Sequence, residues 1–311
     1  MRRDRLAKAV AASLLLLTSA ACAEQSQPAG QQHGDDGWQV AWRDDFTGGE
    51  GGQPNPDDWI VDTGTGYPGG ASNWGTGEIQ TYTADPANLA LDGEGNLRIT
   101  PRRDSAGRWT SARIETKRAD FKAPDGGVLR VEGRVRMPDA TGPAGLGYWS
   151  AFWALGSPYR GDLWNWPGIG EVEFMENVNG LDRVWGLLHC GTAQGGPCDE
   201  SNGIGGSTAC PDQPCQAAFH TYRFEWDRSA APEQLRWYVD GRQYTTVGQD
   251  RVDAANWARM TSHAGYFLLL NVAIGGGFPN GVAKVDTPTP ATEPDRPMVV
   301  DYVSVSTKPR A

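Results

Sequence analysis

Basic residues are scarce in this chain of 311 residues. Its 28 Lys and Arg stand against 38 Asp and Glu, which gives a net charge of −10 at pH 7. Removing residues 1–21 takes away four basic residues and one Asp, so the remainder carries −13. Such an acidic surface repels phosphate backbones and anionic lipids. The charge therefore argues against nucleic acid as a partner and, more mildly, against an anionic polysaccharide as substrate.

No apolar run is long enough to span a membrane. The run near the N-terminus, with four leucines at positions 14–17, follows four basic residues and precedes small residues and Cys22. This is the pattern of an export signal. We expect residues 1–22 to be a signal peptide with a lipobox, Cys22 to be lipidated and residues 23–37 to form a flexible tether. Ser19 stands where a lipobox usually has Leu, so ordinary cleavage and secretion is the alternative.

Cysteine is rare, with five in the chain. Setting Cys22 aside leaves an even number in an exported protein, which indicates two disulfides. The spacing lacks the short paired intervals of zinc modules. Three pairings are open, and we favour Cys190 with Cys198 and Cys210 with Cys215. These bonds would hold the long Gly-rich loop 191–216.

Long patterns with a helical period are absent from residue 38 onward, as are internal repeats and breaks in composition. Short runs rich in Val, Ile, Trp, Tyr and Thr recur instead, separated by Gly and Pro. This is typical of an all-β sandwich or jelly roll, here one domain over residues 38–311. We expect one short helix around 252–260 and strands at 38–46, 96–100, 111–117, 127–137, 148–154, 184–189, 220–226, 236–239, 266–274 and 299–306.

The segment Glu171-Val-Glu-Phe-Met-Glu176 places three carboxylates in an apolar run. Alternation of apolar and polar residues predicts a half-buried strand. Because carboxylates are rarely buried without a partner, this row is predicted to face a substrate cleft. The alternative is an acidic strand that faces solvent.

The spacing of the three carboxylates requires an irregular strand. Glu171 and Glu173 share a face, whereas Glu176 would point the other way in a regular strand. A one-residue bulge after Glu173 would return Glu176 to the first face, roughly 13 Å from Glu171 between α-carbons. Two long side chains leaning together across that distance could bring their carboxyl groups to the ~5–5.5 Å typical of a retaining glycosidase.

These residues resemble the signature of glycoside hydrolase family 16, in which Glu-hydrophobic-Asp-hydrophobic-hydrophobic-Glu carries the chemistry. The resemblance implies Glu171 as nucleophile, Glu176 as acid/base and Glu173 in the place of the supporting Asp. Further blocks match in order: Trp42-Arg-Asp-Asp-Phe46, Glu78-Ile-Gln-Thr-Tyr-Thr83, Thr110-Ser-Ala-Arg-Ile114, Trp149-Ser-Ala-Phe-Trp153, Leu270-Asn-Val-Ala-Ile-Gly-Gly276 and Asp301-Tyr-Val303. Residues 168–180 and 189–191 are most similar to the branch that acts on β-1,3-glucans. This implies a concanavalin A-like β-jelly roll with a concave cleft, and retaining endo-hydrolysis.

Aromatic residues independently indicate a sugar site, because pyranose faces stack on aromatic rings. Trp149 and Trp153 precede the Glu strand, and Trp153 fits core and cleft equally. Trp74, Trp164 and Trp166 lie on expected loops and are assigned to the cleft. Asn73, Glu78, Arg113 and Asn271 are predicted to bind hydroxyls, and the resemblance places His189 near the acid/base. The alternative for His189 is a hydrogen-bonded strand residue.

The mechanism requires no cofactor, and we expect a monomer that binds β-glucan and meets a membrane only through its lipid anchor. The resemblance also implies a structural calcium with Asp301 as ligand; a plain surface carboxylate is the alternative. Two rival functions remain. A transglycosylase would use the same residues, and a non-catalytic glucan-binding protein is favoured only by Glu173 in the usual Asp place.

Overall fold

The computed structural model describes residues 37–310. The predicted signal peptide, Cys22 and nearly all of the predicted tether lie outside the described residues. Within the described range, no helix has the length and apolar character needed to cross a membrane.

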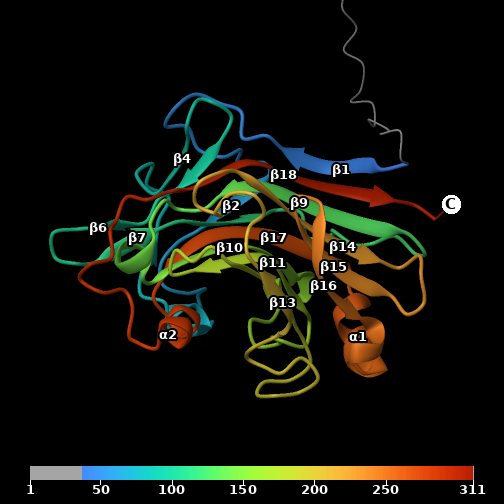
Figure 1. The fold of residues 1–311 in the computed structure, drawn as a ribbon. Helices are drawn as coiled ribbons and strands as arrows, with labels where there is room; N and C mark the ends of the chain where they lie inside the picture. Colours follow the sequence, from blue (N-terminus) through green and yellow to red (C-terminus); the bar gives the residue numbers. More distant parts are fainter. Residues whose placement is uncertain (1–36, 311) are drawn as a thin grey trace, which may run out of the picture. The chain divides into compact units, whose positions relative to one another are not determined.

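Two antiparallel sheets form the body of the structure (Figure 1). The first, sheet A, runs in the order β16 (Arg242–Gly248), β15 (Gln234–Val239), β14 (His220–Asp227), β9 (Val128–Arg136), β18 (Met298–Lys308), β5 (Leu97–Ile99) and β4 (Leu89–Leu91), with β1 (Gln39–Asp44) paired to β18. The second, sheet B, runs β13 (Ile204–Thr208), β12 (Val184–His189), β11 (Glu171–Val178), β10 (Tyr148–Gly156), β17 (Tyr266–Ile274), β8 (Arg113–Thr116) and β2 (Trp59–Asp62). The predicted β-sandwich is confirmed.

Smaller elements complete the fold. A third sheet joins β3 (Thr81–Tyr82), β7 (Trp109–Ser111) and β6 (Arg102–Arg103). The helices are α1 (Ala254–Thr261) and α2 (Gly277–Ala283), and the 3-10 turns are η1 (Ser72–Gly75), η2 (Gly142–Gly145), η3 (Ser157–Arg160) and η4 (Gln249–Arg251). Both α-helices lie beyond sheet B, on the side away from β1 and β18 (Figure 1).

The expected strands all occur, with small shifts at their ends, and the expected helix is α1. The Asp253 side chain begins that helix by accepting hydrogen bonds from the backbone N–H of Ala255 and Asn256, as an N-cap does. The sequence analysis did not anticipate α2, the strands β2, β3, β4, β6, β13 and β16, or β7 as a strand separate from β8.

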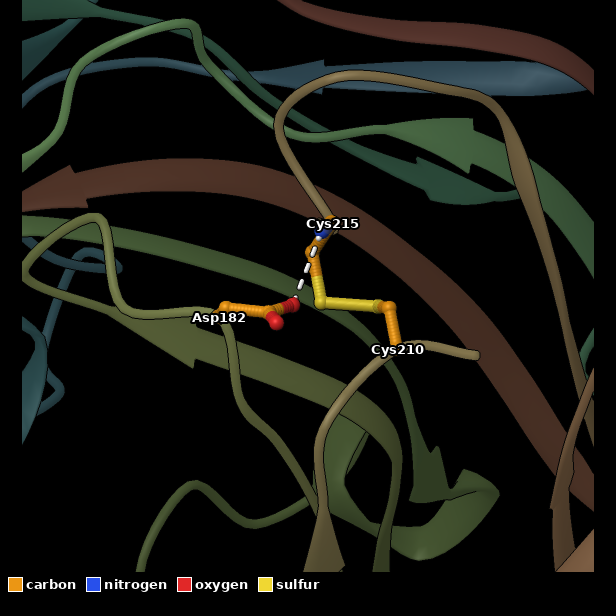
Figure 2. A group of neighbouring side chains, drawn as sticks. All are labelled: Asp182, Cys210 and Cys215. Atoms are coloured by element: carbon orange, nitrogen blue, oxygen red, sulfur yellow. Dashed lines mark hydrogen bonds between the residues drawn. A yellow bond between two sulfur atoms is a disulfide. The ribbon is translucent and has the colours of Figure 1, made fainter. Parts of the chain in front are cut away.

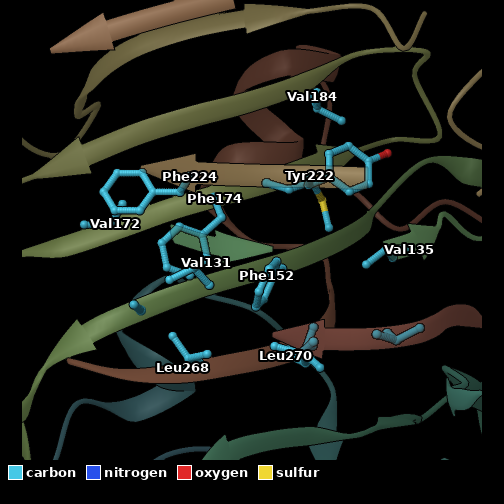
Figure 3. Packing of buried hydrophobic residues seen from close by; sticks show 14 of the residues in the cluster. Val131, Val135, Phe152, Val172, Phe174, Val184, Tyr222, Phe224, Leu268 and Leu270 are labelled. Atoms are coloured by element: carbon cyan, nitrogen blue, oxygen red, sulfur yellow. The ribbon is translucent and has the colours of Figure 1, made fainter. Parts of the chain in front are cut away.

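The hydrophobic core fills the space between the two sheets (Figure 3). Alternate residues of sheet B point inward, among them Phe152 and Leu270, and meet Val131 and Phe224 of sheet A. The ring centroids of Phe152 and Phe174 are 5.0 Å apart, and those of Phe174 and Phe224 are 5.1 Å apart. Burying each such side chain contributes about 1.5–3 kcal/mol, so this aromatic stack ties the central strands of the two sheets together.

The predicted bulge in β11 is confirmed. Phe152 of β10 pairs with Met175, and the next residue, Trp153, pairs with Glu173, so Phe174 has no partner on β10. Phe174 and Met175 are both buried in the core. Because two consecutive side chains enter the core, Glu176 returns to the outer face of sheet B.

Candidate active site

The three carboxylates of β11 share the outer face of sheet B. Glu173 is 5% exposed and Glu176 is 4% exposed, while Glu171 is half-buried. The same face carries a small apolar cluster that includes Trp153 of β10 and Phe267 of β17. The acidic groups are therefore largely removed from water, which excludes the reading of β11 as a solvent-facing acidic strand.

Glu176 lies beside Trp149, whose indole Nε1–H donates to its Oε1 at 2.8 Å. Burial raises the pKa of the Glu176 carboxyl to about 7, although the charge of His189 and the Trp149 hydrogen bond lower it. A carboxyl group with this pKa holds a proton in mildly acidic solution and can donate it near neutral pH.

Glu171 faces His189, which lies directly opposite it on β12. The Oε1 atom of Glu171 is 3.8 Å from Nε2 of His189. Burial raises the pKa of Glu171, and the positive charge of His189 opposes that rise. The imidazolium therefore favours the ionised form of this carboxylate.

Glu173 lies between the other two carboxylates. Its Oε2 atom is buried and has no hydrogen-bond partner among residues 37–310. Burial raises its pKa well above the usual value, and the neighbouring Glu176 and Glu171 raise it further. Burial and the two neighbouring carboxylates therefore favour the protonated form of Glu173.

His189 is held from its far side by Glu200, a residue that the sequence analysis did not single out. Nδ1 of His189 is 2.9 Å from Oε2 of Glu200. Burial lowers the pKa of His189, but the Glu200 hydrogen bond and the charge of Glu171 outweigh it and bring the pKa to about 9. No sequence motif links Glu200 to His189, because the contact depends on the path of the loop after β12.

A buried hydrogen-bond chain connects three of the predicted substrate-binding residues. Trp153 Nε1 donates to Asn271 Oδ1 at 2.7 Å, and Asn271 Nδ2 donates to the Tyr82 hydroxyl at 3.1 Å. That hydroxyl donates to Glu78 Oε2 at 3.0 Å. Burial raises the pKa of Glu78, opposed by the charge of Arg113. The chain fixes Trp153 and Asn271 beside β11.

Arg113 of β8 is buried and joins the predicted residues of this region. Its Nε lies 3.0 Å from Oδ2 of Asp62, and its Nη2 donates to the Tyr67 hydroxyl at 3.1 Å. The guanidinium carbon is 4.5 Å from the ring centroid of Trp74 and 4.8 Å from that of Trp153. The sequence analysis missed Asp62 and Tyr67, which anchor the arginine.

Three predicted residues, Trp166, Trp164 and Asn73, remain to be placed. The Trp166 ring centroid is 6.0 Å from that of His189. Trp164 is 69% exposed, so it does not form part of the buried group. Asn73 has a left-handed backbone conformation in η1, with φ of 50°, next to Trp74.

Two further aromatic residues border Glu176, and the sequence analysis missed one of them, Trp185. Trp185 of β12 lies opposite Glu176 in the sheet. The Phe278 ring of α2 meets both tryptophans edge-on, with centroids 5.7 Å from Trp149 and 5.2 Å from Trp185. Trp149, Phe278 and Trp185 therefore form an aromatic border on this side of the acid/base candidate.

The two disulfides join Cys190 to Cys198 and Cys210 to Cys215, which confirms the favoured pairing. Asp182 accepts a hydrogen bond from the backbone N–H of Cys215 at 3.0 Å (Figure 2). These two cysteines and Asp182 are the one group of three metal-type side chains among residues 37–310, and the disulfide already occupies both sulfur atoms. They therefore do not form a metal site.

Asp301, the expected calcium ligand, forms an ion pair with Arg134. No group of three potential metal-binding side chains in the described part of the chain includes it. Such groups consist of His, Cys, Asp and Glu only, and the calcium stays a prediction.

The chain was compared with family models, curated proteins and solved structures. No family model matches the chain. A β-glucanase of Rhodothermus marinus is 32% identical over 281 residues, which cover 86% of this chain and 85% of that protein. The crystal structure of an endo-1,3-β-glucanase from Streptomyces sioyaensis is 55% identical, with a TM-score of 0.86 over 91% of this chain and 99% of that one. A non-specific endo-β-1,3(4)-glucanase of family 16 is 26% identical, with a TM-score of 0.66 over 88% of this chain and 92% of that one. The chain belongs to glycoside hydrolase family 16 and is a glycoside hydrolase.

Proposed function

We propose that the protein is an exported endo-acting hydrolase of β-1,3-glucan that works by retaining double displacement. The relatives whose names state this activity support the substrate class, above all the Streptomyces sioyaensis enzyme at 55% identity. A polysaccharide substrate also suits the aromatic residues of the site, because sugar rings stack on indole rings. The basic and then apolar start of the chain supports export.

One observation carries the mechanism: the bulge places Glu171 and Glu176 on one face in different electrostatic settings. Glu176 has a pKa of about 7 and accepts a hydrogen bond from Trp149. Glu171 has the imidazole of His189 at 3.8 Å. Paired titratable groups in different environments are the usual basis for dividing the acid and nucleophile roles.

In the first step, the protonated Glu176 carboxyl donates its proton to the glycosidic oxygen. A carboxylate oxygen of Glu171 attacks the anomeric carbon as the bond to that oxygen breaks. The released chain leaves with a new hydroxyl, and the rest of the glycan stays bound to Glu171 as an ester.

In the second step, the Glu176 carboxylate takes a proton from water as the water oxygen attacks the anomeric carbon. The bond to Glu171 breaks, and Glu171 leaves as a carboxylate. The product keeps its anomeric configuration, and both residues return to their starting protonation states. No cofactor takes part in either step.

Glu173 supports the nucleophile in this scheme. Its raised pKa keeps it protonated, and a proton shared with Glu171 orients that carboxylate. In the sheet, Glu173 lies opposite Trp153 of β10 and Leu187 of β12. This arrangement favours a working enzyme over a binding protein that has lost its chemistry.

The substrate-binding residues fall into two groups. We assign stacking contacts to Trp74, Trp149, Trp153 and Trp166 around the carboxylates, and a contact with a more distant sugar to the exposed Trp164. We assign a hydroxyl contact to Asn73. Arg113 and Asn271 are buried and bonded within the protein, so we assign them the role of holding Trp74 and Trp153 in place.

Reducing-sugar release from laminarin, barley mixed-linkage glucan and agarose tests this function, with Glu171→Gln as the matched inactive variant. We expect release from laminarin by the parent protein and none by the variant. No release from any glycan, with retained binding to one, would instead support a lectin-like protein. Longer products at high glycan concentration would support a transglycosylase.

A further inference from the structure

Glu200 is a buried carboxylate to which the proposed mechanism gives no role. Its side chain is fully enclosed, with 0% exposure. It lies on the loop between β12 and β13, two residues after Cys198. A carboxylate is rarely buried so completely unless it is paired and hydrogen-bonded. Its partners therefore indicate what it does.

Both carboxylate oxygens of Glu200 are used. Oε2 lies 2.9 Å from Nδ1 of His189, and Oε1 accepts the backbone N–H of Cys190 at 2.8 Å. The loop that carries Glu200 is closed by the disulfide between Cys190 and Cys198. Backbone hydrogen bonds in both directions with Gly195, each 2.6 Å long, hold Glu200 itself. The carboxylate is thus fixed relative to the end of β12.

The loop also packs directly on the imidazole ring. Gly203 has φ of 73°, and a Cβ added there would lie 2.9 Å from Cε1 and 3.0 Å from Nε2 of His189. Only a glycine allows the backbone to approach the ring this closely. The ring is therefore held by Glu200 at one nitrogen and by the loop backbone near the other.

The contacts of His189 determine which nitrogen serves the active site. Because Nδ1 is bonded to Glu200, Nε2 is the atom that faces Glu171, at 3.8 Å. The charged groups that act on the ring are Glu171, Glu176 and Glu200. A ring fixed in this way carries its positive charge toward the nucleophile.

We propose, on the basis of the function above, that Glu200 is a positioning residue for hydrolysis. It holds the His189 imidazolium with Nε2–H directed at the Glu171 carboxylate, and the Cys190 to Cys198 disulfide fixes the loop that carries it. The charge of His189 lowers the pKa of both Glu171 and Glu176. Glu200 therefore sets the pH range in which Glu171 is ionised and Glu176 is protonated.

The main test compares the pH dependence of kcat/KM for the parent and Glu200→Gln on laminarin. Glutamine keeps the size of the side chain but removes the charge that stabilises the imidazolium. With His189 neutral, the pKa of Glu176 rises. The pKa of Glu171 also rises, because the lost charge of His189 had a larger effect on it than the removed charge of Glu200, which acted in the opposite direction. Both limbs of the profile therefore move to higher pH, by at least about half a pH unit. We expect the maximum to fall about tenfold to a hundredfold, mainly through kcat, by analogy with carboxylates that orient metal-binding histidines.

The matched control is Asp199→Asn, which removes the exposed carboxylate next to Glu200 that does not contact His189. It should leave the profile unchanged. A Glu200→Gln protein with an unmoved profile would overturn the proposal, whether its activity is normal or merely reduced, because a structural role lowers the amount of active protein without changing its titration.

Two further measurements cover a variant that folds poorly or a parent that proves inactive. If Glu200 acts through His189, Glu200→Gln should cost no further activity in a His189→Gln background, and additive losses would contradict the proposal. Proton NMR titration of the four histidines needs no turnover. We expect the pKa of His189 to fall in Glu200→Gln; an unchanged value would refute the link. The two proposals can also fail separately. If the pKa of His189 is lower in Glu200→Gln than in the parent, but the parent releases no sugar from any glycan, the link between Glu200 and His189 stands and the proposed function fails.

Discussion

Both sheets carry buried glutamates on their outer faces, but the glutamates have different neighbours. On sheet A, Glu225 of β14 lies opposite Arg130 of β9 and Arg236 of β15, so an arginine stands on each side of it. Oε1 of Glu225 is 2.8 Å from Nη2 of Arg130. On sheet B, Glu176 of β11 lies between Ala151 and Trp185. Glu225 of sheet A is therefore paired with arginine, whereas Glu176 of sheet B has no arginine partner and accepts a hydrogen bond from Trp149.

The difference shows how pairing with arginine changes the pKa of a buried carboxylate. Asp227 of sheet A is partly buried, which raises its pKa, but hydrogen bonds from Ser229 and the charge of Arg236 outweigh this and lower it. Burial raises the pKa of Glu171, Glu173 and Glu176, and no arginine is paired with them in the described structure. Sheet B thus gives up stability to keep groups that can exchange protons.

The largest expected effect separates the two faces by activity. Glu171→Gln removes the proposed nucleophile and Glu176→Gln removes the proposed acid. Each should lower kcat on laminarin by about 10²–10⁴-fold or more. Glu225→Gln should keep near-normal kcat but lose about 1–2 kcal/mol of stability, because Arg130 keeps a weaker partner. Steady-state kinetics and urea unfolding measure both quantities. Near-full turnover by either sheet B variant would contradict the assignment.

The next effect concerns the dependence of stability on pH. Glu176 has a folded pKa of about 7, raised from 4.5, so its contribution to stability is fully present below about pH 4.5 and is lost as pH rises to 7. The difference corresponds to on the order of 3 kcal/mol. His189, with its pKa raised from 6.5 to about 9, extends the loss to alkaline pH.

Glu176→Gln should therefore flatten the decline in stability between pH 5 and pH 7, measured by urea unfolding across that range. The paired Glu225→Gln serves as control and should leave the decline as steep as in the parent. Equal slopes in the parent and Glu176→Gln would show that Glu176 is ionised in the folded protein throughout this range.

The smallest effect concerns Glu173. Burial raises the pKa of Glu173 and so favours its protonated form, which glutamine should replace with little change because an amide N–H can also donate to Glu171. We expect Glu173→Gln to keep kcat within about tenfold of the parent, far above Glu171→Gln. A loss as large as that of Glu171→Gln would mean that Glu173 acts as an anion.

The sequence predicts the strand β11 and its bulge well, because the information for both is local. Phe174 and Met175 are consecutive apolar residues between carboxylates, and only a bulge lets both enter the core while Glu171 and Glu176 share a face. The number of cysteines predicts two disulfides, and the structure selects the favoured pairing from the three that the sequence leaves open. The main strands follow from β-branched and aromatic runs.

What the sequence could not predict depends on the path of loops or on tertiary pairing. Glu200 reaches His189 through a loop whose course the disulfide fixes. β13 contains Gly205 and Gly206 and forms a strand only because β12 pairs with it. α2 begins at Gly277 and includes Pro279, both poor helix formers. These features have no local signal to detect.

The central claim is that Glu171 and Glu176 cleave β-1,3-glucan with retention. Proton NMR of the anomeric signals during the first minutes of laminarin hydrolysis tests it most directly. Retention predicts that the β-anomer of the new reducing end appears first and that the α-anomer grows later by mutarotation. Initial release of the α-anomer would mean that water attacks directly, and it would contradict Glu171 as the nucleophile.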